Sequence, residues 1–165
     1  MTKLEFLNKM KTQLYACYDI EEQKQLGPSY YDLFAKSHIK NEKYFGSKSI
    51  NLYRFENHEY YLIKSIDKID DAFLTLFSKN LIAASLGLVT PHQEHMSTIV
   101  HGIIVIDTDL EIDYTDVIKN FRYKKSFAFG FKGYLDVYLS VVNTSNQTIL
   151  RHRLQKQLDQ FVATA

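Results

Sequence analysis

Alternation of large and small residues along one stretch constrains the fold more than any other feature. The stretch from Lys125 to Asn143 is KSFAFGFKGYLDVYLSVVN, in which Phe first alternates with Ala, Gly and Lys, and Leu or Val then alternates with polar residues. Because successive strand residues point to opposite faces of a sheet, each half predicts a strand with one apolar face. We expect a hairpin that turns near Gly133. Three aromatic rings of its first strand should then point into the core: Phe127, Phe129 and Phe131.

Helix caps and apolar periodicity predict the elements before this hairpin. Thr2 and Glu5 match a capping box at the start of a helix over 2–18, which the polar run 19–25 and Gly27-Pro28 should end. Strands are expected over 31–39, 49–55 and 59–66, with a tight turn at Asn57-His58. A helix over 72–87 should follow the acidic residues Asp67, Asp70 and Asp71, which suit its N-terminus. The segment STIVHGIIVID has apolar residues on both strand faces, which predicts a central strand.

The end of the chain completes the predicted order. A short helix is expected over 113–121 before the hairpin, and Thr144 with Gln147 should cap a last helix that has an apolar stripe from Leu150 to Phe161. The elements then follow the order α-βββ-α-β-α-ββ-α. With 165 residues, 45% of them apolar, the chain is long enough for one real core. We predict a single α+β domain over 1–165, with a mixed, mostly antiparallel sheet flanked by helices.

Charge and cysteine content narrow the classes of partner and compartment. There are 20 basic and 19 acidic residues, so the net charge of +1 provides no overall field that attracts nucleic acid. Cys17 is the single cysteine and cannot form an internal disulfide. No apolar run reaches the length of a membrane helix, and the first residues lack the pattern of a secretion signal. The sequence therefore predicts a cytoplasmic protein that does not cross a membrane.

The densest group of metal-binding residue types is PHQEH, followed by one more histidine on the predicted central strand. Its candidate ligands are His92, Glu94, His95 and His101. Imidazole and carboxylate groups bind zinc, and catalytic zinc sites often use three protein ligands. The spacing matches no established metal motif, and His101 also suits a buried structural role. A small metal-dependent enzyme is one hypothesis, although the sequence carries no recognisable catalytic or cofactor motif.

Two further patterns point toward nucleic acid. The segment from Arg122 to Phe129 mixes basic and aromatic residues and partly resembles the first ribonucleoprotein motif of RNA recognition domains; its candidate contacts are Arg122, Lys124, Lys125, Phe127 and Phe129. The predicted order α-βββ-α-β also resembles metal-dependent nuclease folds, which carry Glu-x-Lys on a sheet strand. The only such triplet here is Glu22-Gln23-Lys24, in a predicted loop. The sequence favours the interpretation that the Phe residues are core over RNA binding.

Three segments carry a resemblance that spans most of the chain: NEKYFGSKSINLYRFENHEYYLIKS, EHMST leading into IVHGIIVID, and KKSFAFGFKGYLDVYLSVV. Together they are similar to a family of uncharacterised proteins from Gram-positive bacteria. The resemblance implies a bacterial cytoplasmic setting and no particular activity.

The leading hypothesis is a non-catalytic binding or protein-interaction domain. It follows from the missing nucleophile and phosphate-loop motifs and from the near-neutral charge. The partner would be another protein or a second copy of the chain. An exposed apolar or aromatic patch would favour this hypothesis over a metal-dependent enzyme.

Overall fold

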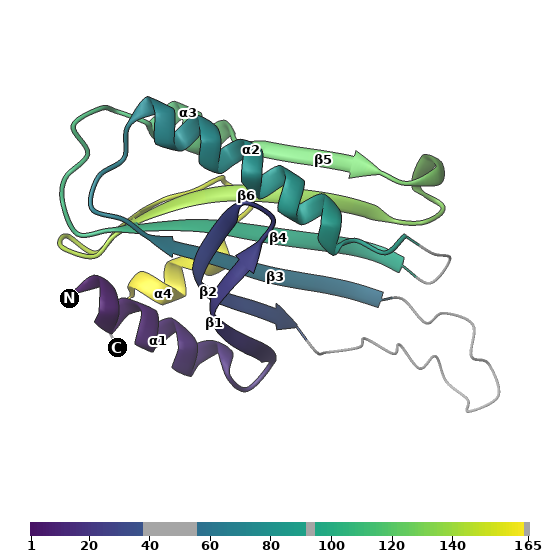
Figure 1. Cartoon of the computed structure of the whole chain (residues 1–165), viewed down its shortest axis with the longest axis horizontal. Coiled ribbons are helices and arrows are strands. Elements are labelled where there is room, and N and C mark those ends of the chain that lie inside the picture. The colour runs from purple at the N-terminus through teal and green to yellow at the C-terminus, as the bar shows by residue number, and fades with distance from the viewer. Residues whose placement is uncertain (38–55, 92–94, 164–165) are drawn as a thin grey trace.

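A computed structural model describes residues 1–37, 56–91 and 95–163 (Figure 1). Its helices are α1 (Lys3–Leu14), α2 (Asp71–Leu88), α3 (Thr115–Asn120) and α4 (Asp159–Val162), with short 3-10 turns η1 (Ala128–Gly130) and η2 (Lys156–Leu158). Its strands are β1 (Tyr18–Leu26), β2 (Ser29–Ser37), β3 (Glu56–Ser65), β4 (His95–Ile106), β5 (Arg122–Ser126), β6 (Tyr134–Asn143) and β7 (Thr148–Leu150).

The strands of the described residues form one mixed sheet of seven strands in the order β1-β2-β3-β4-β6-β5. β7 pairs with β6 as well, because β5 covers only Tyr134–Tyr138 and β7 takes the positions Val141–Asn143. β4 runs parallel to both of its neighbours, whereas the other pairings are antiparallel. The α+β class and the mostly antiparallel sheet are therefore confirmed, and so is the central position of β4.

Helices cover both faces of the sheet and create two cores. In Figure 1, α2 and α3 lie above the sheet, and α1 and α4 lie below it. On β4, Val100 and Ile104 pack toward α2, while Ile103 and Val105 pack toward α1 and α4. This two-sided burial explains why the β4 sequence is apolar at odd and even positions. The residues that α1 and α4 bury against the sheet include Phe6, Met10, Leu14 and Phe161.

One glycine lets α2 approach the sheet closely. A Cβ atom built on Gly102 of β4 would lie 2.3 Å from Cδ2 of Leu81 on α2. Leu81 is fully buried, so the position leaves no space for even one additional carbon. Gly102 is therefore required by packing.

The start of α1 agrees with the predicted capping box, and α2 starts beside the acidic residues predicted to suit its N-terminus. Thr2 accepts a hydrogen bond from the Glu5 amide at 3.2 Å, and the Glu5 carboxylate accepts one from the Thr2 amide at 2.7 Å. Asp70 caps α2 by accepting from the Phe73 amide at 2.7 Å. Each side chain satisfies an amide that has no partner inside its helix, which explains why these starts follow from local sequence.

Two predictions in the first half are wrong. The polar run 19–25 is not a loop, because it forms β1, an edge strand that pairs with β2 along its whole length. Asn57 and His58 do not form a turn: they lie inside β3 and pair with Ser97 and Thr98 of β4. The Asn57 side chain accepts a hydrogen bond from the Ser97 hydroxyl at 2.7 Å, so its polar group is satisfied within the sheet. The strand predicted over 49–55 lies outside the described residues.

Two predictions in the last third are also wrong. The Phe-rich segment is not a regular strand, because β5 ends at Ser126 and residues 127–133 turn back toward β6. Phe129 is fully exposed and the Phe131 side chain is 83% exposed, so only Phe127 packs partly against the core. The last predicted helix is replaced by β7, η2 and the short α4. Of its predicted stripe, Leu158 and Phe161 are buried, whereas Leu154 is half exposed.

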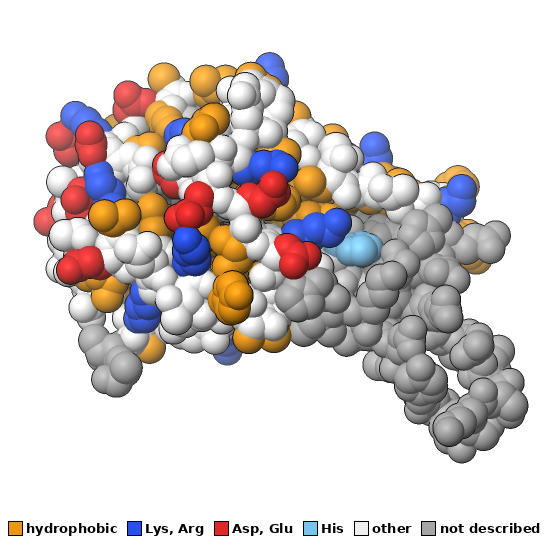
Figure 2. All heavy atoms as spheres, turned by 60° about the horizontal axis from the view of Figure 1, so that its bottom comes forward, with side chains coloured by type: hydrophobic (Ala, Val, Ile, Leu, Met, Phe, Trp, Pro, Cys, Tyr) orange, Lys and Arg blue, Asp and Glu red, His pale blue; other side chains and the backbone are white. Residues whose placement is uncertain are grey.

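The surface has no single sign of charge over the face shown in Figure 2, where acidic and basic side chains alternate with apolar ones. Within the described ranges, no helix combines the length and the apolar composition needed to span a bilayer.

Candidate functional site

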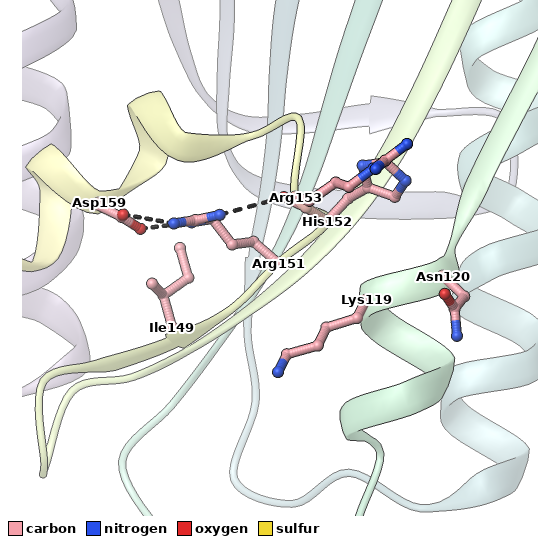
Figure 3. A pocket seen from close by; sticks show the side chains of 7 residues that line it. All are labelled: Lys119, Asn120, Ile149, Arg151, His152, Arg153 and Asp159. Carbon is pink, nitrogen blue, oxygen red and sulfur yellow. Dashed lines mark hydrogen bonds and ion pairs between the residues drawn. The ribbon is translucent and has the colours of Figure 1, made fainter.

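A polar cavity of about 500 Å³ opens between the end of α3 and the segment that follows β7 (Figure 3). We call it the α3 pocket. It is lined by Lys119, Asn120, Ile149, Arg151, His152, Arg153 and Asp159. Its volume falls within the range of small-molecule sites, and six of its seven lining residues are polar or charged.

Arg151 and Asp159 form the fixed wall of the α3 pocket. The guanidinium binds the carboxylate in a bidentate manner, with Nε to Oδ1 at 2.5 Å and Nη2 to Oδ2 at 2.6 Å. The hydrogen bond from Arg151 lowers the pKa of Asp159, so the carboxylate stays ionised. Arg151 also donates to the carbonyl of His152 at 3.3 Å, which ties the pair to the turn that carries Arg153.

Two cations of the α3 pocket lack such a partner. Neither Lys119 nor Arg153 forms a hydrogen bond or ion pair through its side chain with a residue that the structure describes. In Figure 3 Lys119 extends from the end of α3 toward the side where Ile149 lies, whereas Arg153 extends from the segment after β7 in the opposite direction, beside His152. Lys119 still interacts electrostatically with Asp113, since its charge is one of the causes that lower the pKa of that carboxyl.

His152 connects the α3 pocket to the face of the sheet. Its ring centroid lies 5.2 Å from that of Tyr138 on β6. Burial and the nearby charges of Arg122 and Arg153 lower the pKa of His152, so its ring is neutral at neutral pH. Arg122 also contacts Tyr138, with Cζ at 5.8 Å from the ring centroid, and pairs with the buried Asp136 at 3.1 Å.

Basic and aromatic side chains continue along β5 from this point. Lys124 lies over the ring of Tyr134 with Nζ 4.9 Å from the centroid, and Lys125 lies 5.7 Å from the centroid of Phe127. β5 is one of the two edge strands in the order of the described sheet, and both lysines are exposed. No acidic residue occurs between Arg122 and Leu135 in the sequence, so this edge carries cations only.

The turn after β5, residues 127–133, presents two aromatic rings to solvent; we call it the hairpin tip. A hydrogen bond of 2.9 Å from the Phe127 amide to the Gly133 carbonyl closes it. Ala128, Phe129 and Gly130 all have positive φ angles, of 49°, 57° and 91°. A left-handed conformation costs a residue with a Cβ about 1–2 kcal/mol. The tip thus adopts a strained backbone whose result is an outward Phe129.

A separate, partly buried polar cluster is formed by side chains of β1, β3 and β4. Nε2 of His101 is 2.7 Å from Oε1 of Glu59, and the Tyr18 hydroxyl donates to Oε2 at 2.7 Å. Burial opposes ionisation of Glu59, but hydrogen bonds from His101 and the tyrosines outweigh it and lower the pKa of this carboxyl. Tyr61 stacks on His101 with centroids 4.6 Å apart. Nδ1 of His101 has no partner among the described residues.

The predicted metal ligands are not assembled in the part of the chain that the structure describes. His92 and Glu94 lie outside the described residues, and His95 is the first residue of β4. His101 is 1% exposed and uses Nε2 toward Glu59. Among the described residues no group of three or more His, Cys, Asp or Glu is arranged to hold a metal ion. The metal hypothesis thus stays a prediction.

The Glu-x-Lys triplet of the nuclease comparison lies on β1, at the sheet edge, and not in a loop. Glu22 pairs with Lys11 at 2.8 Å, and Lys24 pairs with Glu21 at 3.0 Å. Both groups are engaged in surface ion pairs, so this triplet does not form a site with the central strands.

The structure keeps the predicted basic and aromatic residues on one hairpin but changes their roles. Lys124 and Lys125 are exposed, whereas Arg122 is held by Asp136 and Phe127 packs partly inward. The nucleic-acid contacts predicted from sequence do not include Phe131, although it belongs to the same run and is exposed. It also missed Lys119 and Arg153, because nothing local indicates that residues so far apart share a pocket.

Comparison with known proteins identifies a family and gives no activity. Neither the curated proteins nor the solved structures include a match to this chain. A family profile matches residues 2–164, nearly the whole chain, and its description is a domain of unknown function, DUF8052. The expectation of a family without assigned activity is confirmed: the chain belongs to the DUF8052 family.

Proposed function

We propose that this chain is a binding domain for single-stranded RNA, which it contacts with the hairpin tip and the adjoining edge of β5. The observation that carries the proposal is the full exposure of Phe129 beside Phe131, in a segment whose only charged residues are cations. An exposed aromatic patch of this kind favours the leading hypothesis from sequence, a non-catalytic binding domain, although the sequence predicted that these rings point into the core.

The rings supply the sequence-independent part of the contact. Every base has a flat face, and stacking on an aromatic side chain contributes about 1–3 kcal/mol per base. Phe129 and Phe131 are two residues apart and both expose most of their surface, so they offer adjacent stacking positions. The strained backbone at Ala128 and Phe129 supports this role, because strain is retained where the resulting side-chain position is used.

The cations supply the phosphate contacts. Lys124 and Lys125 lie on the exposed edge strand, and Lys132 lies on the hairpin tip. Lys124 and Lys125 are consecutive residues and so point to opposite faces of β5, while Lys132 follows on the tip. Cations therefore flank the edge where a single-stranded backbone would lie. The near-neutral charge of the whole chain does not oppose this, because a local cationic edge suffices for contact.

The proposal is tested by fluorescence anisotropy with a labelled decauridylate. We expect saturable binding that weakens as salt increases, since bound phosphates release counterions. The double variant Phe129→Ala/Phe131→Ala should bind at least tenfold more weakly. These side chains are exposed, so circular dichroism and melting temperature should remain those of the wild type.

Tyr15→Ala is the matched control, because it removes another exposed aromatic ring that lies away from the hairpin. It should bind RNA as the wild type does. Equal affinity of the double variant and the wild type would overturn the proposal. So would an absence of RNA binding together with Phe129-dependent cosedimentation with anionic phosphatidylserine vesicles, which would assign the tip to a membrane surface instead.

A further inference from the structure

A second cavity lies on the α1 side of the sheet. It has a volume of about 420 Å³ and is lined by the first half of α1 together with residues of β1, β2 and β3; we call it the α1 cavity. In Figure 1 the start of α1 lies at the left of the sheet, whereas the turn between β5 and β6 lies at the right. The α1 cavity is therefore separate from the hairpin tip, and its volume is that of a small-molecule site.

One carboxylate in the lining of the α1 cavity is fixed in place and has no cationic partner. Oδ2 of Asp32 accepts hydrogen bonds from the Ser65 amide at 2.6 Å and from the Ser65 hydroxyl at 2.9 Å. Oδ1 has only a contact of 3.5 Å with Nε2 of Gln23, which is long for a hydrogen bond. Asp32 forms no ion pair with a residue that the structure describes. It thus presents a positioned negative charge to the cavity.

The other charged groups of the lining already have partners. Lys3 donates to Asp67 and lies 3.4 Å from Asp107, so two carboxylates surround one ammonium group. Glu22 pairs with Lys11 at 2.8 Å. The ammonium of the lining is therefore not available to the unpaired carboxylate, and the lining keeps an excess of negative charge. A cationic ligand matches this charge, whereas an anion would be repelled.

Aliphatic side chains in the same lining indicate the rest of the ligand. Leu4 and Leu7 come from α1, and Leu33 follows Asp32 directly in β2. A ligand with an aliphatic stem could pack on these leucines while its charged end reaches Asp32. A bare metal ion fits less well, because no three His, Cys, Asp or Glu side chains within the described ranges are arranged to hold one.

Gln23 adds a second acceptor beside the carboxylate. Its φ of 54° is a left-handed conformation that is unfavourable for a residue with a Cβ. Strain of this kind is retained where the resulting side-chain position is used. The side-chain nitrogen of Gln23 is directed toward Asp32, which leaves the amide oxygen to accept from a ligand. An ammonium or guanidinium group has several donors and could bind both acceptors.

We infer that the α1 cavity binds a primary ammonium or guanidinium group carried on an aliphatic stem, with Asp32 as its ion-pair partner. This chemistry has two sources, a free alkylamine and the lysine or arginine side chain of a peptide. The inference does not depend on the proposed contact between the hairpin tip and RNA.

A titration followed by nitrogen-15 NMR tests the inference, with the Ser65 amide, which donates to Asp32, as the reporter signal. The probes are butylamine and Nα-acetyl-lysine methylamide, and the corresponding norleucine compound has a similar stem without the charge. We expect a saturable shift of the Ser65 signal with at least one cationic probe and none with the norleucine compound. A larger affinity for butylamine would identify a free amine as the source, and a larger affinity for the lysine compound would identify a peptide.

Asp32→Asn should weaken binding of the cationic probe at least tenfold. It keeps an oxygen that can accept from Ser65, so circular dichroism should show an intact fold. Glu21→Gln is the matched control, since it removes one negative charge from β1 outside the lining. It should leave the affinity unchanged. Leu4→Ser tests the stem: Leu4 is 68% exposed, so the fold should tolerate the change while binding of butylamine weakens relative to methylamine.

Three results would overturn the inference. The first is an equal shift with the norleucine compound, and the second is no shift of the Ser65 signal with either cationic probe. The third is a loss of affinity in Glu21→Gln as large as that in Asp32→Asn, because the effect would then be general electrostatics. Asp32→Asn should bind decauridylate as the wild type does, so the RNA proposal and this one can fail separately.

Discussion

The Nε2 atom of His101 lies 2.7 Å from Oε1 of Glu59, and this contact joins the central strand β4 to its neighbour β3 inside the sheet. An ionised carboxylate can only accept, so the proton of this hydrogen bond belongs to Nε2. The Tyr18 hydroxyl donates to the other oxygen at 2.7 Å and brings β1 into the same cluster. Burial and the neighbouring carboxylate raise the pKa of Tyr18, which keeps this donor protonated.

Replacing Glu59 should change how stability depends on pH. Its pKa is lower in the folded protein than in the unfolded chain, so ionisation adds stability above the unfolded pKa of about 4.3. That contribution is lost as pH falls through the folded pKa. We expect Glu59→Gln to destabilise the protein by roughly 1–2 kcal/mol at pH 7. The difference from the wild type should shrink at pH 3.5.

Urea denaturation at pH 7, 5 and 3.5 measures this difference. Glu22→Gln serves as the control, because it removes a carboxylate from a solvent-exposed ion pair with Lys11 and should change stability little at any of these values. A constant gap between Glu59→Gln and the wild type across the range would contradict the prediction.

Gly102→Ala should destabilise the protein by about 1–3 kcal/mol, because the added methyl group collides with buried Leu81. Thermal unfolding measures the effect. Gly87→Ala is the matched control in α2, since nothing lies within 4 Å of its added Cβ. It should be neutral or slightly stabilising. If truncating Leu81 fails to reduce the cost of Gly102→Ala in a double-mutant cycle, the collision is not its cause.

Substitutions of Arg122 and Lys124 should have different effects, the first on the stability of the protein and the second on its binding to RNA. Arg122→Gln leaves the Asp136 carboxylate, whose side chain is 7% exposed, without its ion-pair partner and should lower the melting temperature. Lys124→Gln removes an exposed cation and should leave the melting temperature unchanged while weakening binding to decauridylate and flattening its salt dependence. Equal melting temperatures of the two variants would contradict the structural role of Arg122.

Ala128→Gly should stabilise the hairpin tip. Its φ of 49° is one that glycine adopts without the steric cost that a Cβ imposes. The gain is offset by the greater freedom of glycine in the unfolded chain, which leaves about 0.5–1 kcal/mol in urea unfolding. Ser126→Gly is the control, because it lies in regular β5 and should destabilise. A destabilised Ala128→Gly would show that the tip is not strained.

Elements with a local physical cause were predictable from sequence. The starts of α1 and α2 followed from the side chains of Thr2, Glu5 and Asp70, each of which satisfies a helix amide that is three residues or fewer away. The strand β4 followed from apolar residues on both faces, which only a strand covered on both sides requires. In the two helix starts the deciding contacts join residues that are close in the sequence. In β4 the deciding factor is burial of both faces, which affects all of its residues in the same way.

Elements decided by distant pairing were not predictable. The polar run 19–25 becomes β1 because β2 supplies a complementary edge, and β7 forms because β5 leaves part of β6 unpaired. At the hairpin tip, consecutive positive φ angles interrupt the alternation that predicted three inward rings. The α3 pocket combines Lys119 with Arg153 through tertiary packing alone, so its residue pattern has no local spacing to detect.

The parallel pairing of β4 on both sides has a consequence for synthesis on the ribosome. β4 can join β3 once α2 has crossed over, but its other neighbour, β6, is made only after residues 107–133 have emerged. Until then one edge of a strongly apolar strand has no partner, and such edges promote aggregation. Folding of the central sheet is therefore late and depends on contacts between distant residues. During this period the nascent chain exposes an unpaired apolar strand, the kind of segment that chaperones bind.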